Sequence, residues 1–201
     1  MSRCINDTYG VVGLTLSQIG LFLATGIQLV AVFSLVFGSN WQRTADIRSL
    51  ATSFSTLLAD TDTRFFENTT LFQFPEKNYD YRVHLSTEFI SISTKGFWDD
   101  DLVVTERLYI QPWLRSSDQN WTTGQDLHAY LNTTTGHQGT ENDHISLTTF
   151  TSLRQEQNTS VSCYALHPLQ IVCRESVFLE KVTICYDDDK KYDILLVYQL
   201  L

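Results

Sequence analysis

The sequence predicts a mainly β protein, in which an N-terminal transmembrane helix precedes an antiparallel β-sandwich. Three observations predict this fold class: a long apolar run near the N-terminus, a series of short alternating strands behind it, and a low charged content of 18% whose deficit lies in the apolar run. The 201 residues suffice for about one ordinary domain beyond a membrane helix. The net charge of −9, with no cluster of basic residues, excludes a protein that binds nucleic-acid phosphates.

The predicted organisation has four parts. They are a short cytosolic N-terminus (1–10), a transmembrane signal anchor (11–38), a membrane-proximal linker with an amphipathic helix (39–70) and a glycosylated β-sandwich domain (71–201).

The transmembrane helix is predicted from the run between Val11 and Phe37. Between Thr8 and Gln42 the phenol of Tyr9 is the sole ionisable side chain. A bilayer needs about 20 residues of apolar helix, whereas the apolar region of a cleavable signal peptide has about 7 to 15. The length favours an uncleaved anchor, and cleavage near Gly38, which would release a secreted domain, is the alternative.

One stripe of this helix carries small residues, which let a second helix approach closely. The stripe consists of Gly13, Ser17, Gly20, Ala24 and Ala31, with Gln28 beside it. A glutamine in hydrocarbon needs a hydrogen-bond partner, so these residues are predicted to pack on a partner's membrane helix. The alternative is that small residues are common in all membrane helices.

The periodicity behind the anchor changes from helical to alternating. Ile47, Leu50, Phe54, Leu57 and Leu58 recur at helical spacing and predict a short amphipathic helix. From about Leu71 the period becomes two, which predicts strands. The expected strands are Tyr81 to Phe89, Leu102 to Ile110, Ile145 to Leu153, Val161 to Leu166, Leu169 to Cys173, Val177 to Cys185 and Tyr192 to Leu200. The polar stretch from Ser116 to Asp143 is expected to be a long exposed loop.

Glycosylation sequons predict which side of the membrane the domain faces. Matches to N-x-S/T begin at Asn68, Asn120, Asn132 and Asn158, all beyond the apolar run, and a fifth begins at Asn6. They predict that residues 39–201 are lumenal or extracellular, in which case the Asn6 match is accidental. The alternative is a threonine-rich cytosolic domain that matches the motif by chance.

Cysteine usage agrees with an oxidising compartment. Cys163 and Cys173 flank the turn signal His167-Pro168 between two expected strands, so a disulfide between them is expected to staple a hairpin. Cys185 would then be buried and reduced, or form an intermolecular bond, and Cys4 would be a cytosolic thiol. The alternative is that all three domain cysteines are ordinary thiols.

No metal, cofactor or catalytic residue is predicted. His137, Glu141, Asp143 and His144 match no common ligand spacing and read as a solvated loop. The acidic triplets Asp99–Asp101 and Asp187–Asp189 lack the spacing of a calcium loop. The chain contains none of the common catalytic or nucleotide-binding motifs. A lumenal hydrolase or transferase using Asp99, Asp101, His84 and Glu106 is the alternative.

The end of the chain resembles the lumenal domain of GOLD-type seven-helix membrane proteins, the group containing Wntless. The resemblance lies in Asn158-Thr-Ser, Val161-Ser-Cys163, Ile171-Val-Cys173 and Tyr192-Asp-Ile-Leu-Leu, which look like that group's last strands, and in the general layout of a membrane helix before a β-sandwich with a cysteine pair. It covers about the last 45 residues, and those proteins continue into a helix bundle. It implies a module that faces secretory cargo.

The sequence thus favours a non-enzymatic, membrane-anchored glycoprotein of the secretory pathway or cell surface. Its expected partners are the membrane and a protein bound through the helix and the β domain.

Overall fold

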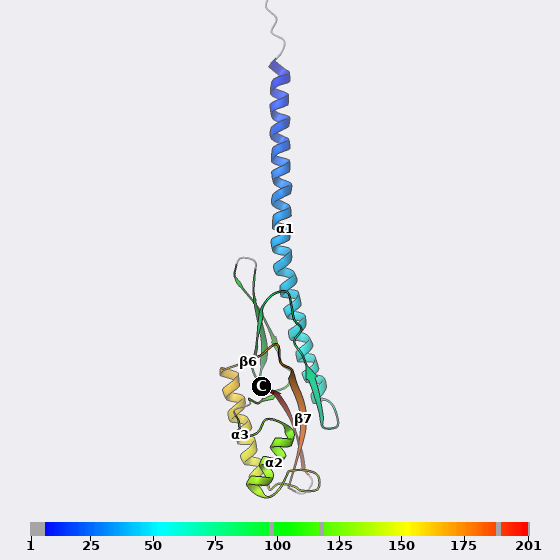
Figure 1. The fold of residues 1–201 in the computed structure, drawn as a ribbon, viewed down its shortest axis with the longest axis vertical. Helices are drawn as coiled ribbons and strands as arrows, with labels where there is room; N and C mark the ends of the chain where they lie inside the picture. The colour runs from blue at the N-terminus through cyan, green and yellow to red at the C-terminus, as the bar shows by residue number, and fades with distance from the viewer. Residues whose placement is uncertain (1–6, 97–98, 117–118, 188–189, 201) are drawn as a thin grey trace, which may run out of the picture. The chain divides into compact units, whose positions relative to one another are not determined.

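The computed structural model describes residues 7–96, 99–116, 119–187 and 190–200. The chain divides into two units, Met1–Arg43 and Thr44–Leu201, and one continuous helix, α1 (Asp7–Asp62), contributes to both (Figure 1). Most of the expected N-terminal segment lies outside the described residues, including Cys4 and Asn6.

The amphipathic helix expected around residues 47–58 is confirmed. Ile47, Ala51, Phe54 and Leu58 lie four, three and four residues apart and are fully buried. The Phe54 ring packs edge-on against Phe72, with 5.2 Å between centroids. The sequence had suggested a separate short helix, whereas this apolar stripe belongs to the last turns of α1.

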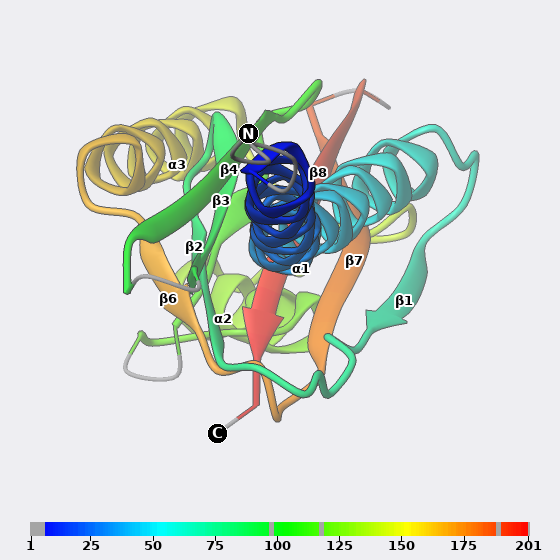
Figure 2. The same ribbon diagram turned by 90° about the horizontal axis from the view of Figure 1, so that it is seen from above.

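The second unit contains two four-stranded sheets (Figure 2). The first has the order β1 (Asn68–Phe72), β7 (Val177–Tyr186), β8 (Lys190–Gln199) and β5 (Trp113–Leu114). The second has the order β4 (Asp101–Arg107), β3 (Phe89–Lys95), β2 (Tyr81–Leu85) and β6 (Leu169–Ile171). Neighbouring strands are antiparallel except β5 and β8, which are parallel. The expected antiparallel pairing is therefore confirmed for most of both sheets.

The central strands of the first sheet, β7 and β8, are buried on both faces. Alternate residues of β8 enter two different clusters: Leu195 and Val197 join the core shared with α1 and the second sheet, while Ile194 and Leu196 join a core shared with two further helices. A strand buried on both faces reads as a continuous apolar run rather than as an alternation. The second sheet contributes one face to the shared core, and its other face is mostly polar, with Val103 exposed on it.

Two helices replace elements that the sequence predicted differently. Helix α2 (Gly124–Thr135) lies inside the stretch expected to be an exposed loop, and it buries Leu127 and Leu131. Helix α3 (Leu147–Leu166) covers residues 147–153 and 161–166, most of the two segments expected to be strands at 145–153 and 161–166. With these helices and the 56-residue α1, the described part of the chain is an α/β mixture rather than mainly β.

The α3 prediction was wrong because threonine and β-branched residues are typical of strands. Two contacts hold the segment helical instead. The Ser146 hydroxyl accepts the Thr149 N–H at the N-cap. Phe150 stacks on Tyr186 of β7, with 3.7 Å between ring centroids. The Asn158–Cys163 segment, compared above with a last strand, is therefore helical.

Candidate functional site

The apolar part of α1 is the feature with the plainest functional meaning. Between Ser17 and Asp62 the described chain has one helix that is long and apolar enough to cross a membrane or to act as a signal anchor. Its apolar side chains are open to the surroundings: Phe22 is 74% exposed and Val30 66% exposed. Removing such a surface from water is strongly favourable, so the segment is suited to an apolar environment.

The small-residue stripe lies on this exposed part of the helix. Ser17, Gly20, Ala24, Gln28 and Ala31 are all exposed, and Gly13 lies in the same helix. No atom outside the helix lies within 4 Å of the position a Cβ would take on Gly20. The stripe has room for a second helix, and packing there stays a prediction.

The four domain sequons all lie in the second unit. Asn68 opens β1 and is half-buried, whereas Asn120, in the loop before α2, Asn132 in α2 and Asn158 in α3 are exposed. Three of the four asparagine side chains are therefore accessible at the surface. Glycosylation at these sites stays a prediction.

The cysteine pair is not joined in the structure. Cys163 and Cys173 are both free thiols, the first exposed on α3 and the second half-buried behind β6. The prediction assumed a hairpin of two strands, but Cys163 lies near the end of a helix. Burial raises the pKa of the Cys173 thiol, so this side chain stays protonated at neutral pH. Cys185 is buried in β7.

The side chains considered for metal binding form local turn contacts. His137 Nδ1 lies 2.7 Å from an Asp143 carboxylate oxygen, and the other oxygen accepts the Gln138 N–H at 2.8 Å. These bonds, first that from His137, hold the pKa of Asp143 below its usual range. Among the described residues no group of three or more His, Cys, Asp or Glu side chains is placed to hold a metal ion.

The alternative enzymatic set is not brought together. Asp99 and Asp101 both form ion pairs with Lys95 at the end of the β3–β4 hairpin. His84 and Glu106 pair in register with Ser91 and Ile90, respectively. Ser91 and Ile90 are successive residues of β3, so they point to opposite faces of the sheet. His84 and Glu106 therefore lie on opposite faces.

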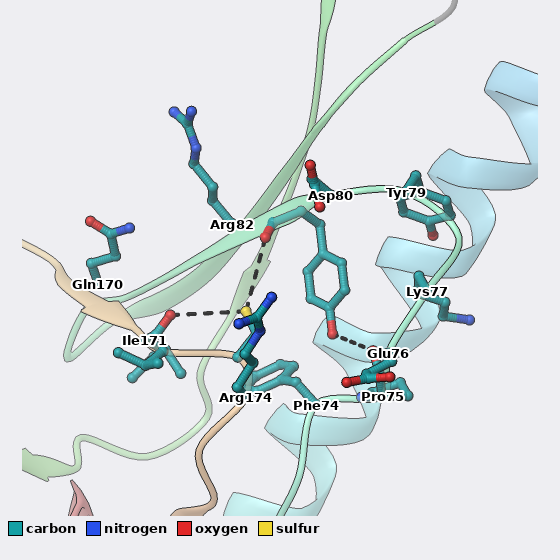
Figure 3. Close-up of a pocket in the computed structure, with 13 residues that line it drawn as sticks. Phe74, Pro75, Glu76, Lys77, Tyr79, Asp80, Arg82, Gln170, Ile171 and Arg174 are labelled. Carbon is teal, nitrogen blue, oxygen red and sulfur yellow. Dashed lines mark hydrogen bonds between the residues drawn. The ribbon is translucent and has the colours of Figure 1, made fainter. Parts of the chain in front are cut away.

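A groove that the sequence did not indicate lies beside β2 and β6 (Figure 3). Its volume is about 680 Å³, within the range of about 300 to 1,000 Å³ typical of ligand sites. Residues 74–82 form one wall, and residues 170–174 form the other. These segments are about 90 positions apart in the sequence. Because of this separation, the sequence alone did not indicate that they form a groove.

Local contacts fix the walls of the groove. The Tyr81 hydroxyl donates to the Pro75 carbonyl at 2.6 Å, which folds the loop between them back onto β2 (Figure 3). The Tyr79 hydroxyl reaches a carboxylate oxygen of Asp46 on α1 at 3.4 Å, and Lys77 forms an ion pair with the same carboxylate at 3.7 Å. These contacts tie the loop to α1 and β2.

The opposite wall is held by a glutamine from β8. The Gln199 side chain accepts the Val172 N–H at 2.9 Å and donates to the Val172 carbonyl at 2.9 Å. Its amide also donates to the Glu175 carbonyl at 3.2 Å. Burial, followed by the nearby Cys173 and Tyr79, raises the pKa of Tyr81 to about 12, so the phenol in the groove is neutral.

Comparison with known proteins adds no assignment: no family model, curated protein or solved structure matches the chain.

Proposed function

We propose that the chain is a non-enzymatic, membrane-anchored glycoprotein of the secretory pathway or the cell surface. The apolar part of α1 crosses the membrane and packs on a partner's membrane helix. The second unit, a β-sandwich with added helices, lies in the lumen or outside the cell and binds a protein partner or cargo, in an accessory or trafficking role.

The exposed apolar segment of α1 carries this proposal. Large apolar side chains between Ile19 and Phe33 stay exposed while the helix continues into a folded unit. All four downstream sequons lie in that folded unit, which supports a lumenal or extracellular placement. The core shared by both sheets supports a sandwich architecture.

The distribution of the sequons favours one face for the partner. They lie on β1, before α2, on α2 and on α3, whereas the second sheet (β4, β3, β2 and β6) carries none. Its outward side chains include Ser91 and Ser93 of β3 and Thr105 of β4, which are small and polar. A sheet face without sequons suits close approach by another protein.

The anchor and its topology are tested in eukaryotic cells expressing the full chain. After alkaline carbonate washing, the protein should stay in the membrane pellet, and an N-glycosidase should lower its apparent mass in steps. Changing Asn68, Asn120, Asn132 or Asn158 to Gln, one at a time, should remove one step each, while Asn6→Gln should change nothing. A band that never shifts would place the second unit in the cytosol and refute the proposal. Shifted protein in the medium would instead indicate a cleaved, secreted domain.

The partner face is tested with added glycans. Ser91→Asn creates a sequon with Ser93, and Val103→Asn creates one with Thr105, both on the second sheet. Leu147→Asn creates a matched control sequon at the start of α3, where the side chain is 53% exposed. In chemical cross-linking of intact cells, the same cross-linked species should be absent for both sheet variants and present for the control variant. Retention in all three would refute this choice of face.

A further inference from the structure

Strand β4 forms an open edge of the second sheet. The order β4-β3-β2-β6 places it at one end of that sheet, where β3 is its one neighbouring strand among the described residues (Figure 2). At one end of the β3–β4 pair the Gly96 N–H donates to the Asp100 carbonyl at 2.8 Å. At the other end the Leu108 N–H donates to the Glu88 carbonyl at 2.8 Å. Bonded and non-bonded positions alternate in an antiparallel pair, so the even-numbered residues of β4 bond to β3 and the odd-numbered residues turn their N–H and C=O groups outward.

The outward backbone groups in the middle of β4 are open. Within the described part of the chain, no hydrogen bond involves the outward N–H and C=O groups of Val103 or Thr105. The Arg107 carbonyl accepts the Ser55 hydroxyl of α1 at 3.3 Å, which agrees with an outward direction at this odd-numbered residue. A strand edge whose N–H and C=O groups lack partners is a template for pairing with another strand.

Strand β4 also lacks the devices that commonly protect an edge. It has seven residues, whereas the other edge strands β1, β5 and β6 have five, two and three. It contains no proline, glycine or lysine, and the residues from Val103 to Thr105 are all β-branched. The sequon at Asn68 lies on β1, so a glycan there would shield that edge, whereas β4 carries no sequon. Among these edges β4 is therefore the one best suited to receive a further strand.

The two ends of β4 present opposite charges on one face of the sheet. Side chains of alternate residues point to the same face, and those of Asp101, Val103, Thr105 and Arg107 are all exposed. Oppositely charged residues that face each other across two strands stabilise the pair, whereas like charges destabilise it. An added antiparallel strand is therefore favoured when it has an acidic residue opposite Arg107 and a basic residue opposite Asp101.

We propose that β4 binds an extended segment of a partner protein by strand addition. The segment runs antiparallel to β4 and has, from its N-terminal end, an acidic residue, five residues rich in β-branched types, and a basic residue. Val103 and Thr105 each exchange two backbone hydrogen bonds with the residue opposite, and the charged ends of β4 fix the register. This inference rests on the proposed protein-binding function and specifies how the partner binds.

The test measures fluorescence anisotropy of labelled peptides with the purified full chain in detergent micelles. The probe is the heptapeptide Asp-Thr-Val-Val-Val-Thr-Lys, with a C-terminal amide and a fluorophore on an N-terminal glycine linker. The matched control has the two charged residues exchanged, which places like charges opposite both ends of β4. This exchange should weaken binding about fivefold or more.

Methylation of peptide nitrogens tests the backbone hydrogen bonds. The third and fifth residues of the probe lie opposite Thr105 and Val103, so their N–H groups face β4. Their N-methylation should weaken binding about tenfold or more, because it removes two hydrogen bonds. The N–H groups of the second and sixth residues face away from β4, and their N-methylation should change the Kd by about twofold or less.

Variants of β4 test the same contacts from the other side. Val103→Pro removes an outward donor and no bond to β3, a position where an edge strand tolerates proline, and should weaken binding about fivefold or more. Val103→Thr keeps the donor and is the matched control. An Asp101→Lys, Arg107→Glu double variant leaves the backbone unchanged and should reverse the preference between the two charge orders.

Absence of binding, or equal binding of the two N-methylated peptides, would overturn the proposal. So would an unchanged charge preference in the double variant. A dimer of the full chain that Val103→Pro dissociates would overturn it in favour of a second copy as the occupant. The peptide assay does not depend on membrane topology or glycans. Its failure therefore refutes strand addition alone, whereas failure of the glycosylation and cross-linking experiments refutes the proposed function.

Discussion

Lys181 joins the end of α1 to the first sheet, and its replacement should clearly lower the stability of the fold. Its ammonium group donates to the carbonyls of Asp62 and Arg64 at 2.6 and 2.7 Å and forms an ion pair with Asp193 at 3.0 Å. The side chain is 8% exposed. The last carbonyls of a helix have no hydrogen-bond partner within the helix. The Lys181 ammonium group supplies a donor, and a positive charge, to the Asp62 carbonyl at the end of α1.

The magnitude follows from the bonds that Lys181→Met removes. Two hydrogen bonds from a charged donor contribute about 1.5 to 3 kcal/mol each. Part of this is offset, because methionine avoids the cost of burying an ammonium group, so the net loss should be about 2 to 4 kcal/mol. For a domain of this size a loss of 3 kcal/mol corresponds to roughly 6 to 12 °C in Tm.

The assay is thermal unfolding followed by tryptophan fluorescence, since Trp113 and Trp121 are buried in the second core. Lys191→Met is the matched control: it removes an ion pair with Glu141 in which both side chains are largely exposed. The control should lower Tm by about 2 °C or less, because exposed pairs contribute little. A Tm for Lys181→Met within about 2 °C of that of the unmodified chain would refute the conclusion that Lys181 stabilises the contact between the end of α1 and the first sheet.

Two further predictions concern α2. Gly124→Ala should destabilise the fold by about 1 to 3 kcal/mol, because an added Cβ would lie 2.5 Å from a Val182 methyl and 2.6 Å from a Glu180 carboxylate oxygen; an unchanged midpoint in denaturant would contradict this. The N–H of Thr123 donates to Asp126 and holds the pKa of that carboxyl below its usual range. The stability it contributes is therefore present above the unfolded pKa and is lost as pH falls through the lower folded pKa. Tm measured from pH 6 downward should fall less steeply in Asp126→Ala, and identical pH profiles would argue against this contribution.

Elements built on one strong local pattern were predictable from the sequence. The helical spacing from Ile47 to Leu58 identified the buried face of α1, and the apolar run before it identified the exposed helix. Strands β2, β4, β6, β7 and β8 followed from alternation, whereas β1, β3 and β5 were not expected as separate strands. The continuity of α1 did not follow, because Ser39 to Arg43 interrupt the apolar pattern without breaking the helix.

Elements whose stability comes from distant contacts were missed. In α2 the apolar residues are few, and Leu127 and Leu131 become a buried stripe only against β7 and β8. The Thr-rich α3 is fixed by its N-cap and by the stacking of Phe150 on Tyr186, 36 residues apart by number. The groove likewise requires Arg174 to lie near Glu76, a proximity that only the pairing of β2 with β6 creates. The aromatic and charged run from Phe74 to Arg82 was the one available signal.

The shared position of β8 between two cores has a consequence for synthesis. Residues 190–199 follow all the other described elements in the chain, so neither core can close until this strand has left the ribosome. On the proposed lumenal topology, with synthesis at about 5 to 20 residues per second, the sequon asparagines would enter the lumen before this strand, while their surroundings are still unfolded. Sites such as Asn132 and Asn158 would then meet the glycosylation machinery as extended chain, and their later enclosure in helices would be no obstacle to modification.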